Sequence, residues 1–264
     1  MTGDVENLTV RVQRTRRNVL KMGVILAPAA LARTKTARAA PACAVRCNCF
    51  LKGTKIQTAE GKRKVEDLAM GETLPTMFGG MAPIQWIARY SLKKSDPSKP
   101  WVKDAMPVRI ARSALAPGVP QADLYVTGDH ALFVDGLLIA VGNLINGTTI
   151  MRHEAREYDE LEFFNIKLER QDVIYAEGTP VETLLDVDER AVNFAEYFRR
   201  YGTPKTQDAP CAPRVSYGGG RGELKSRLRS AISPLLDRRE PIDVIRDRLE
   251  ERGLALSRQL EPVS

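Results

Sequence analysis

Short runs of alternating apolar and polar residues fill the middle of the chain, from Cys49 to about Asp188. Alternation with a period of two is typical of strands that bury one face, and no convincing helical periodicity interrupts it. The predicted strands cover residues 54–58, 64–68, 83–92, 107–110, 124–126, 130–134, 163–168 and 173–175. Asp135-Gly136 and Asn146-Gly147 are two-residue hairpin signals between apolar runs. The pattern therefore predicts an all-β domain of many short strands.

The chain after this domain has a different pattern. Residues 189–222 begin with the spacing of a short amphipathic helix and continue as a linker rich in proline and glycine. Residues 223–264 are charged and carry leucine and isoleucine at helical spacing, and Pro241 is well placed to open a second helix. We therefore expect a C-terminal helical extension. A solvated helical hairpin that packs on the domain explains it better than a dedicated partner site.

Residues 1–39 have the composition of an export signal. Arg16 and Arg17 precede a mild apolar run, and a small-residue cleavage site lies at Ala39-Ala40. This order resembles a twin-arginine signal, and the apolar run is too short to span a bilayer. We therefore expect the twin-arginine translocase as a partner and a bacterial protein that is periplasmic or extracellular, with no stable membrane span when mature. The alternative is a disordered basic arm.

The net charge of +7 is concentrated in the same segment. Residues 1–39 hold eight basic and two acidic side chains, so six of the seven net positive charges lie there. The rest of the chain is close to neutral and offers no basic surface of the kind that nucleic acids require. We therefore expect no nucleic-acid partner.

Four cysteines, Cys43, Cys47, Cys49 and Cys211, permit three fully paired disulfide schemes in an oxidising compartment. A bridge among the others leaves Cys49 free, whereas a bridge to Cys49 blocks it. The close spacing of the first three also suggests metal ligands, but both histidines lie more than eighty positions away and there is no second cysteine pair. We therefore expect neither a metal site nor a cofactor.

The candidate chemistry lies at Cys49, just before a Gly-Thr turn, and at a distant Thr127-x-x-His130. The thiol of Cys49 can attack the carbonyl of the preceding Asn48 through a five-membered ring, so proximity is built into the chain. The resulting thioester lies uphill of the amide unless the departing nitrogen is protonated. His130 is the natural general acid for that step. Thr127 is placed to hydrogen-bond the scissile peptide and hold it distorted.

These motifs resemble the Hint family, the fold shared by hedgehog autoprocessing domains and inteins. Four stretches in order look especially like the bacterial standalone Hint subfamily: Cys49-Phe50-x-x-Gly53-Thr54, Val65-Glu66-Asp67-Leu68-x-x-Gly71, Asp129-His130-Ala131-Leu132 and Asp172-Val173-Ile174-Tyr175-Ala176-Glu177-Gly178. The resemblance implies a Hint-type β-fold over residues 49–188. It also implies that Cys49 is the nucleophile and that Thr127 and His130 form the block that catalyses the N-to-S acyl shift.

Departures from the family pattern limit the expected reaction. Inteins end in His-Asn, which cuts the C-terminal junction, whereas residues 179–183 lack this pair and the chain runs on for about eighty residues. We therefore predict no splicing. Gln171 stands where many relatives carry a histidine, which leaves Asp172 as a candidate orienting carboxylate. A carboxylate at the start of a strand serves equally well as a structural cap.

The leading hypothesis is an exported, single-turnover domain that cleaves its own chain at Asn48–Cys49, with its N-terminal segment as the substrate. If the signal is removed after Ala39, only residues 40–48 precede the nucleophile, so cleavage releases a short peptide. The alternative is an inactive Hint-fold β-domain that acts as an exported binding or structural module. A third hypothesis, a cysteine hydrolase for other molecules, requires an open cleft that nothing in the sequence specifies.

Overall fold

The computed structural model describes residues 48–185, 194–202, 209–215, 220–232 and 239–260. The predicted export signal, with Arg16, Arg17 and the Ala39-Ala40 site, lies outside the described residues, as do Cys43 and Cys47. Within the described part, no helix is both long and apolar enough to cross a membrane.

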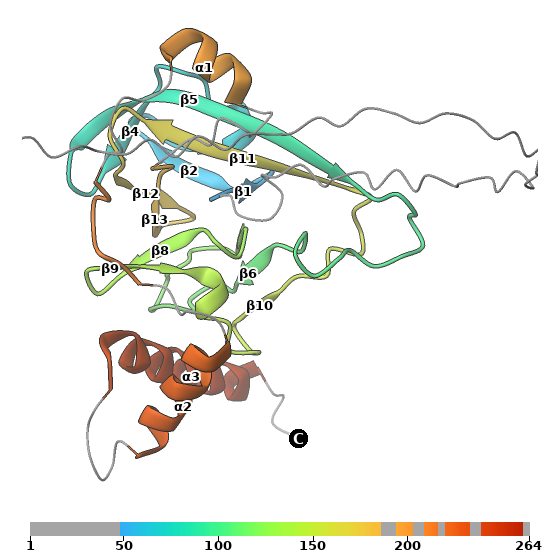
Figure 1. Ribbon diagram of the computed structural model, residues 1–264, viewed down its shortest axis with the longest axis vertical. Coiled ribbons are helices and arrows are strands. Elements are labelled where there is room, and N and C mark those ends of the chain that lie inside the picture. The colour runs from blue at the N-terminus through green and yellow to red at the C-terminus, as the bar shows by residue number, and fades with distance from the viewer. Residues whose placement is uncertain (1–47, 186–193, 203–208, 216–219, 233–238, 261–264) are drawn as a thin grey trace, which may run out of the picture. The chain divides into compact units, whose positions relative to one another are not determined.

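The described strands form two sheets, so the predicted all-β class is confirmed (Figure 1). The first sheet has the order β10 (Ile150–Arg152), β6 (Val108–Ile110), β7 (Leu124–Val126), β1 (Phe50–Leu51), β11 (Glu160–Leu168), β5 (Gly80–Lys93) and β4 (Thr73–Thr76). The second sheet has the order β14 (Arg214–Val215), β9 (Leu137–Ala140), β8 (Ala131–Val134), β13 (Thr179–Glu182), β12 (Val173–Ala176), β2 (Lys55–Thr58) and β3 (Gly61–Lys64).

One main hydrophobic core lies between the strands of both sheets. Ile56 of β2, Leu132 of β8 and Ile166 of β11 all belong to it and are almost completely buried. Strand β5 alternates, with Ile84, Trp86 and Ala88 buried and the residues between them half-buried. Its register with β11 shifts at this point, so Ile84 lies in the main core, whereas Trp86 and Ala88 lie in a separate buried cluster. Strand β11 is buried along most of its length, because β1 and β5 flank it.

Helix α1 (Ala195–Tyr201) lies against β5 (Figure 1). The ring of Tyr197 meets the edge of Trp86 with their centroids 5.9 Å apart. Both side chains belong to a small second cluster of buried residues, so α1 covers a part of β5 that the main core does not reach.

The C-terminal extension contains the two predicted helices, α2 (Gly220–Ile232) and α3 (Pro241–Leu260). Helix α3 begins at Pro241, where a proline loses no backbone hydrogen bond and already has a helical φ. Ile242, Ile245 and Leu249 recur at helical spacing on α3, and all three are buried in the main core of the β-domain. The tail therefore completes the core.

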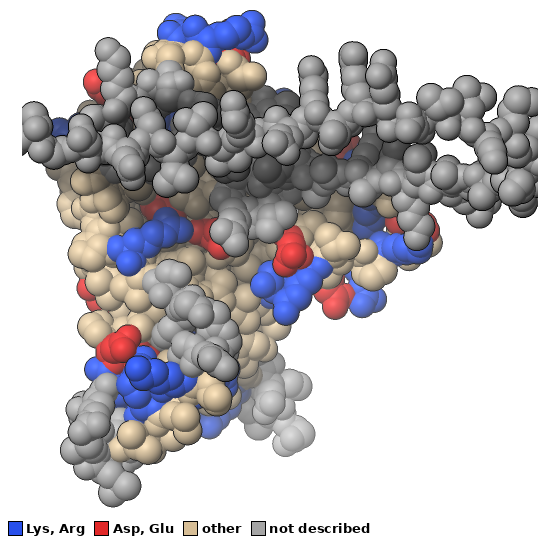
Figure 2. Space-filling model, in the orientation of Figure 1, with Lys and Arg blue, Asp and Glu red and all other residues tan. Residues whose placement is uncertain are grey.

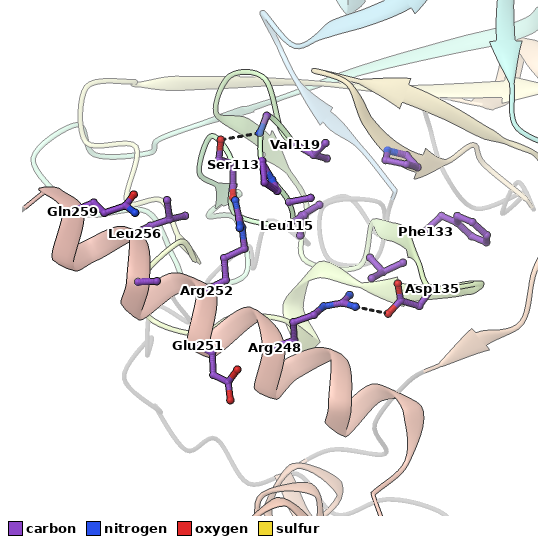
Figure 3. Close-up of a pocket in the computed structure, with 16 residues that line it drawn as sticks. Ser113, Leu115, Val119, Phe133, Asp135, Arg248, Glu251, Arg252, Leu256 and Gln259 are labelled. Atoms are coloured by element: carbon purple, nitrogen blue, oxygen red, sulfur yellow. Dashed lines mark hydrogen bonds and ion pairs between the residues drawn. The ribbon is translucent and has the colours of Figure 1, made fainter.

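Polar contacts also fix α3 on the domain. Arg248 forms an ion pair of 2.8 Å with Asp135 in the turn between β8 and β9. Arg252 Nε donates to the carbonyl oxygen of Ser113 at 2.6 Å. Figure 3 shows both arginines pointing from α3 toward the domain, where they line a groove of about 1020 Å³. On the face in Figure 2, the charged side chains form several small groups, for example at α1 and over the tail, and these groups contain both basic and acidic residues.

Two predicted elements differ from the structure. Residues 64–68 were expected to be a strand, but Val65–Asp67 forms a short 3-10 helix. The Glu66 side chain accepts a hydrogen bond from Gly53 N at 2.8 Å, so this turn anchors the loop after β1.

The turn at Asn146 does not close a hairpin. Asn146 Oδ1 accepts hydrogen bonds from the backbone of residues 148–150 and turns the chain into β10. Strand β10 then pairs with β6 in the first sheet, whereas β9 pairs with β8 in the second sheet.

Candidate active site

Sheet pairing fixes the backbone of Cys49 against the turn that carries Thr127. Phe50 of β1 pairs with Val126 of β7, so Cys49 and Thr127 face each other just beyond the pair. Thr127 N donates to Cys49 O at 3.0 Å, and Cys49 N donates to Thr127 Oγ1 at 3.0 Å. Thr127 therefore binds the amide nitrogen of the Asn48–Cys49 peptide, which is the atom that departs in the predicted reaction.

The carbonyl oxygen of the same peptide bond is bound by Asn165, a residue that sequence reasoning missed. Asn165 Nδ2 donates to Asn48 O at 2.8 Å. Strand β11 carries Asn165, and its register with β1, in which Phe164 pairs with Phe50, brings the amide to this position. The side chain is only 1% exposed. The one feature of the sequence that could have indicated this role is that Asn165 is a polar residue in an otherwise apolar stretch, residues 163–166.

The thiol of Cys49 is completely buried. Burial raises the pKa of this thiol to about 12, although hydrogen bonding with Tyr90, Asn165 and Thr127 opposes the increase. The thiol is therefore protonated at neutral pH. It requires a base before it can attack a carbonyl, because the thiolate is the nucleophilic form.

Tyr90 is a second polar neighbour of the thiol that the sequence did not indicate. It pairs with Phe163, and alternation places Phe163 and Asn165 on the same face of β11. The Tyr90 hydroxyl is buried and makes no conventional hydrogen bond within the described part of the chain. Burial raises the pKa of Tyr90, and the Cys49 thiol raises it further. The hydroxyl is thus a neutral donor close to the sulfur.

His130 is fully buried directly before β8, with its ring edge against Phe50 at a centroid distance of 4.5 Å. Its Nε2 lies 3.1 Å from the carbonyl oxygen of Glu182. A carbonyl only accepts hydrogen bonds, so this contact assigns the proton of the neutral ring to Nε2 and the lone pair to Nδ1. Nδ1 is buried and has no hydrogen-bond partner among the described residues.

Burial lowers the pKa of His130 to about 4. This value is a net result, in which the charge of Arg214 also lowers the pKa and the interactions of the ring with the backbone of Cys49 and Glu182 raise it. The imidazole is therefore neutral at neutral pH. His130 must receive a proton before it can act as the predicted general acid, and Nδ1 is the atom that can receive it.

The buried carboxylate next to His130 belongs to Glu182. Glu182 Oε1 accepts a hydrogen bond from Ala131 N at 2.9 Å. Arg214 Nη1 lies 2.7 and 2.6 Å from the two carboxylate oxygens, and Gln171 Nε2 donates to Oε2 at 3.2 Å. Burial raises the pKa of Glu182, and the charge of Arg214 lowers it. Sequence reasoning gave Glu182 no role.

Asp172 does not take the role of orienting carboxylate for the imidazole. Its Oδ1 accepts hydrogen bonds from Phe78 N at 3.1 Å and Val173 N at 2.7 Å. Asp172 therefore caps the start of β12 and ties it to the turn between β4 and β5. The ring of His130 is instead oriented by the main chain of Glu182.

Both described cysteines, Cys49 and Cys211, are free thiols. Burial, together with the charges of Asp172 and Glu182, raises the pKa of Cys211 to about 11. The disulfide schemes that include Cys43 or Cys47 fall outside the described residues. Among the described residues, no group of His, Cys, Asp and Glu side chains is arranged to hold a metal ion.

One comparison with known protein families covers the region that contains this site. The family model of the Hint domain matches residues 48–188, so the match begins one residue before Cys49. No curated protein sequence gives a significant match.

Similar solved structures include inteins and an intein-like domain. The crystal structure of the gp41-1 intein is 12% identical, with a TM-score of 0.36, and covers 51% of this chain and 98% of its own. A DnaB intein from Synechocystis sp. PCC 6803 is 11% identical, with a TM-score of 0.36, and covers 52% and 99%. A bacterial intein-like domain from Clostridium thermocellum is 13% identical, with a TM-score of 0.38, and covers 52% and 98%.

Proposed function

Since this chain belongs to the Hint domain family, we propose that it is an autoprocessing protein that breaks its own Asn48–Cys49 peptide bond. The observation that carries the proposal is the binding of both sides of this bond. Asn165 donates to the carbonyl oxygen of Asn48, and Thr127 accepts from the amide nitrogen of Cys49. A neutral His130 lies in the same buried site.

The first step is the attack of the thiol on the carbonyl. His130 Nδ1 takes the proton of the Cys49 thiol, and the sulfur forms a bond to the carbonyl carbon of Asn48. Negative charge then develops on Asn48 O, where Asn165 Nδ2 already donates a hydrogen bond. The hydroxyl of Tyr90 stabilises the charge on the sulfur as the proton leaves.

The second step breaks the bond between the carbonyl carbon of Asn48 and the nitrogen of Cys49. The electron pair stays on the nitrogen, which takes the proton back from His130. The product is a thioester between Asn48 and the Cys49 sulfur, with a free α-amino group on Cys49. Water or another nucleophile resolves the thioester, releases the residues up to Asn48 and leaves Cys49 as the new N-terminus.

The proposed reaction ends at N-terminal cleavage, without splicing. Residues 179–183 contain no His-Asn pair, and the last two of them, Glu182 and Thr183, both have structural hydrogen bonds. Glu182 binds Ala131 N and Arg214, and Thr183 Oγ1 exchanges hydrogen bonds with the backbone of Asp172. Neither side chain carries the amide that cyclises in an intein.

We also propose that the protein belongs to the bacterial standalone subfamily and leaves the cytoplasm through the twin-arginine translocase. Residues 1–39 have the sequence features of such a signal. Fractionation of bacteria that express the wild type and an Arg16→Lys/Arg17→Lys variant tests this. The proposal expects a shortened, exported wild type and a retained variant, and equal export of both would contradict it.

Intact-mass analysis of the purified full chain during incubation with dithiothreitol tests the cleavage. Wild type is expected to convert to a product that begins at Cys49, whereas Cys49→Ala and His130→Ala keep the bond between residues 48 and 49. His153→Ala is the matched control, because His153 hydrogen-bonds with Glu157 outside the site and its loss leaves cleavage intact. The alternative, an inactive exported binding or structural module, predicts no conversion in any of the four proteins.

A further inference from the structure

A residue outside the Hint domain match binds Asp129, which precedes His130, and also Glu182, which binds Ala131 on the other side of His130. The match ends at residue 188, and Arg214 lies beyond it in β14. On the basis of the proposed function, we propose that Arg214 is a positioning residue, which holds His130 in place for proton transfer. The active site is then completed by a segment downstream of the family domain.

The backbone of the downstream segment is fixed on the second sheet. Strand β14 pairs with β9 in parallel, with Arg214 opposite Leu138. Leu138 N donates to Pro213 O at 2.9 Å, and Cys211 N donates to Gln171 Oε1 at 3.0 Å. These bonds tie residues 211–215 to β9 on one side and to the residue before Asp172 on the other, so the position of the Arg214 side chain is well defined.

The guanidinium of Arg214 reaches the chain on both sides of His130, directly on one side and through Glu182 on the other. Its Nη2 donates to Asp129 O at 2.8 Å, at the residue before His130. Its Nη1 binds both carboxylate oxygens of Glu182, and Glu182 Oε1 in turn accepts from Ala131 N, at the residue after His130. The carbonyl of Glu182 accepts from the imidazole itself. Arg214 thus fixes the groups that determine where the ring lies.

The same contacts determine the charge around His130. Glu182 on β13 is completely buried, and a buried carboxylate without a partner is strongly unfavourable. Arg214 on β14 is the cation that pairs with it, and its side chain is 36% exposed. The ring also meets two uncharged groups, the Phe50 ring on β1 and the backbone of Cys49. Loss of Arg214 therefore removes the positive charge near the imidazole, and Glu182 takes up a proton more easily.

A histidine titration tests the inference without any need for activity. The pKa of His130 is measured by NMR in the full-length Cys49→Ala protein, where the chain stays intact, and His153→Gln assigns the signals of the two histidines. We expect a pKa of about 4 with Arg214 present. Arg214→Gln should raise this pKa by about half a pH unit or more, because the cation that lowers it is lost.

Arg248→Gln is the matched control. Arg248 also forms an ion pair between the C-terminal extension and the domain, with Asp135, but it does not contact the residues around His130. We expect the pKa of His130 to stay unchanged in this variant. Equal pKa values in Arg214→Gln and Arg248→Gln would overturn the inference.

The cleavage rate provides the second measurement. If Arg214→Gln unfolds, the double variant Arg214→Gln/Glu182→Gln removes both charges, and a glutamine at 182 can still accept from Ala131 N. We expect the folded double variant to cleave at least about tenfold more slowly than Arg248→Gln, because Asp129 O loses its donor. Cleavage at the control rate would overturn the positioning role. If wild type does not cleave, the proposed function fails, whereas the titration still decides the inference.

Discussion

At the residue scale, each polar atom of the Asn48–Cys49 peptide bond has its own side-chain partner. The oxygen binds Asn165 and the nitrogen binds Thr127, while the base, His130, is kept neutral by burial. In the proposed reaction, a thiol with a pKa of about 12 loses its proton to His130 only as the sulfur attacks the carbonyl. No free thiolate then has to form in the buried site.

Replacement of Asn165 tests the stabilisation of the oxyanion. Asn165→Leu keeps a similar volume and removes the donor to Asn48 O, so we expect cleavage to slow by about 100- to 1,000-fold. The rate follows from intact masses in dithiothreitol, and thermal unfolding shows whether the variant is folded. A folded Asn165→Leu protein that cleaves within about twofold of wild type would show that this amide has no part in the reaction.

The lowered pKa of His130 links stability to pH. An unfolded histidine titrates near 6.5 and the folded one near 4, so the unfolded chain binds an extra proton between these values. The free energy of unfolding should therefore fall by about 2–3 kcal/mol as the pH drops from 7 to 4.5. Urea unfolding of Cys49→Ala with and without His130→Gln measures this term. The protein that keeps His130 should lose more free energy of unfolding between pH 7 and 4.5 than the His130→Gln variant, by about this amount. Equal losses in the two proteins would contradict the burial of a neutral imidazole.

The sequence predicts the part of the site that depends on local order. Cys49 follows its target carbonyl directly, and Thr127 and His130 share one turn, so a motif reveals them. Asn165 and Glu182 could not be assigned a role in this way. Their roles depend on which strands pair and in what register, and a single sequence does not give that information.

At the element scale, periodicity predicts the long or regularly alternating elements and fails for the short ones. Strand β5 and helix α3 emerge from their patterns because each has a clear buried face. Strand β14 has two residues in a segment that the sequence presents as a linker, and its partner lies more than seventy positions away. Val65–Asp67 mimics a strand in its alternation but turns because Glu66 binds Gly53 N.

The packing of α3 into the β-domain gives a prediction at this scale. Leu249 is 1% exposed within the main core, so Leu249→Ala should lower the free energy of unfolding by about 2–5 kcal/mol. Leu228→Ala on α2 is the control, because this leucine is 58% exposed and its loss should cost less than about 0.5 kcal/mol. Urea unfolding measures both, and equal small effects would mean that α3 does not complete the core.

At the scale of the whole molecule, the family domain and the C-terminal extension share one core and one candidate active site. Alternation correctly predicts the all-β class, and the helical spacing of leucine and isoleucine correctly predicts the helical tail. The family resemblance predicts the type of fold. The dependence of the domain on the extension was not predicted. Buried contacts of Leu249 and the ion pair of Arg214 join segments that lie far apart in the sequence, and charge and periodicity do not report such pairings.

The most direct test of the central claim is a mass spectrum of the full chain after hydroxylamine treatment at neutral pH. The account predicts two fragments in wild type, one that ends in a hydroxamate of Asn48 and one that begins at Cys49, because hydroxylamine captures the thioester carbonyl. Cys49→Ala should give neither fragment under the same conditions. An intact Asn48–Cys49 bond in wild type, or equal cleavage in the Cys49→Ala variant, would contradict the claim that Cys49 breaks the bond that precedes it.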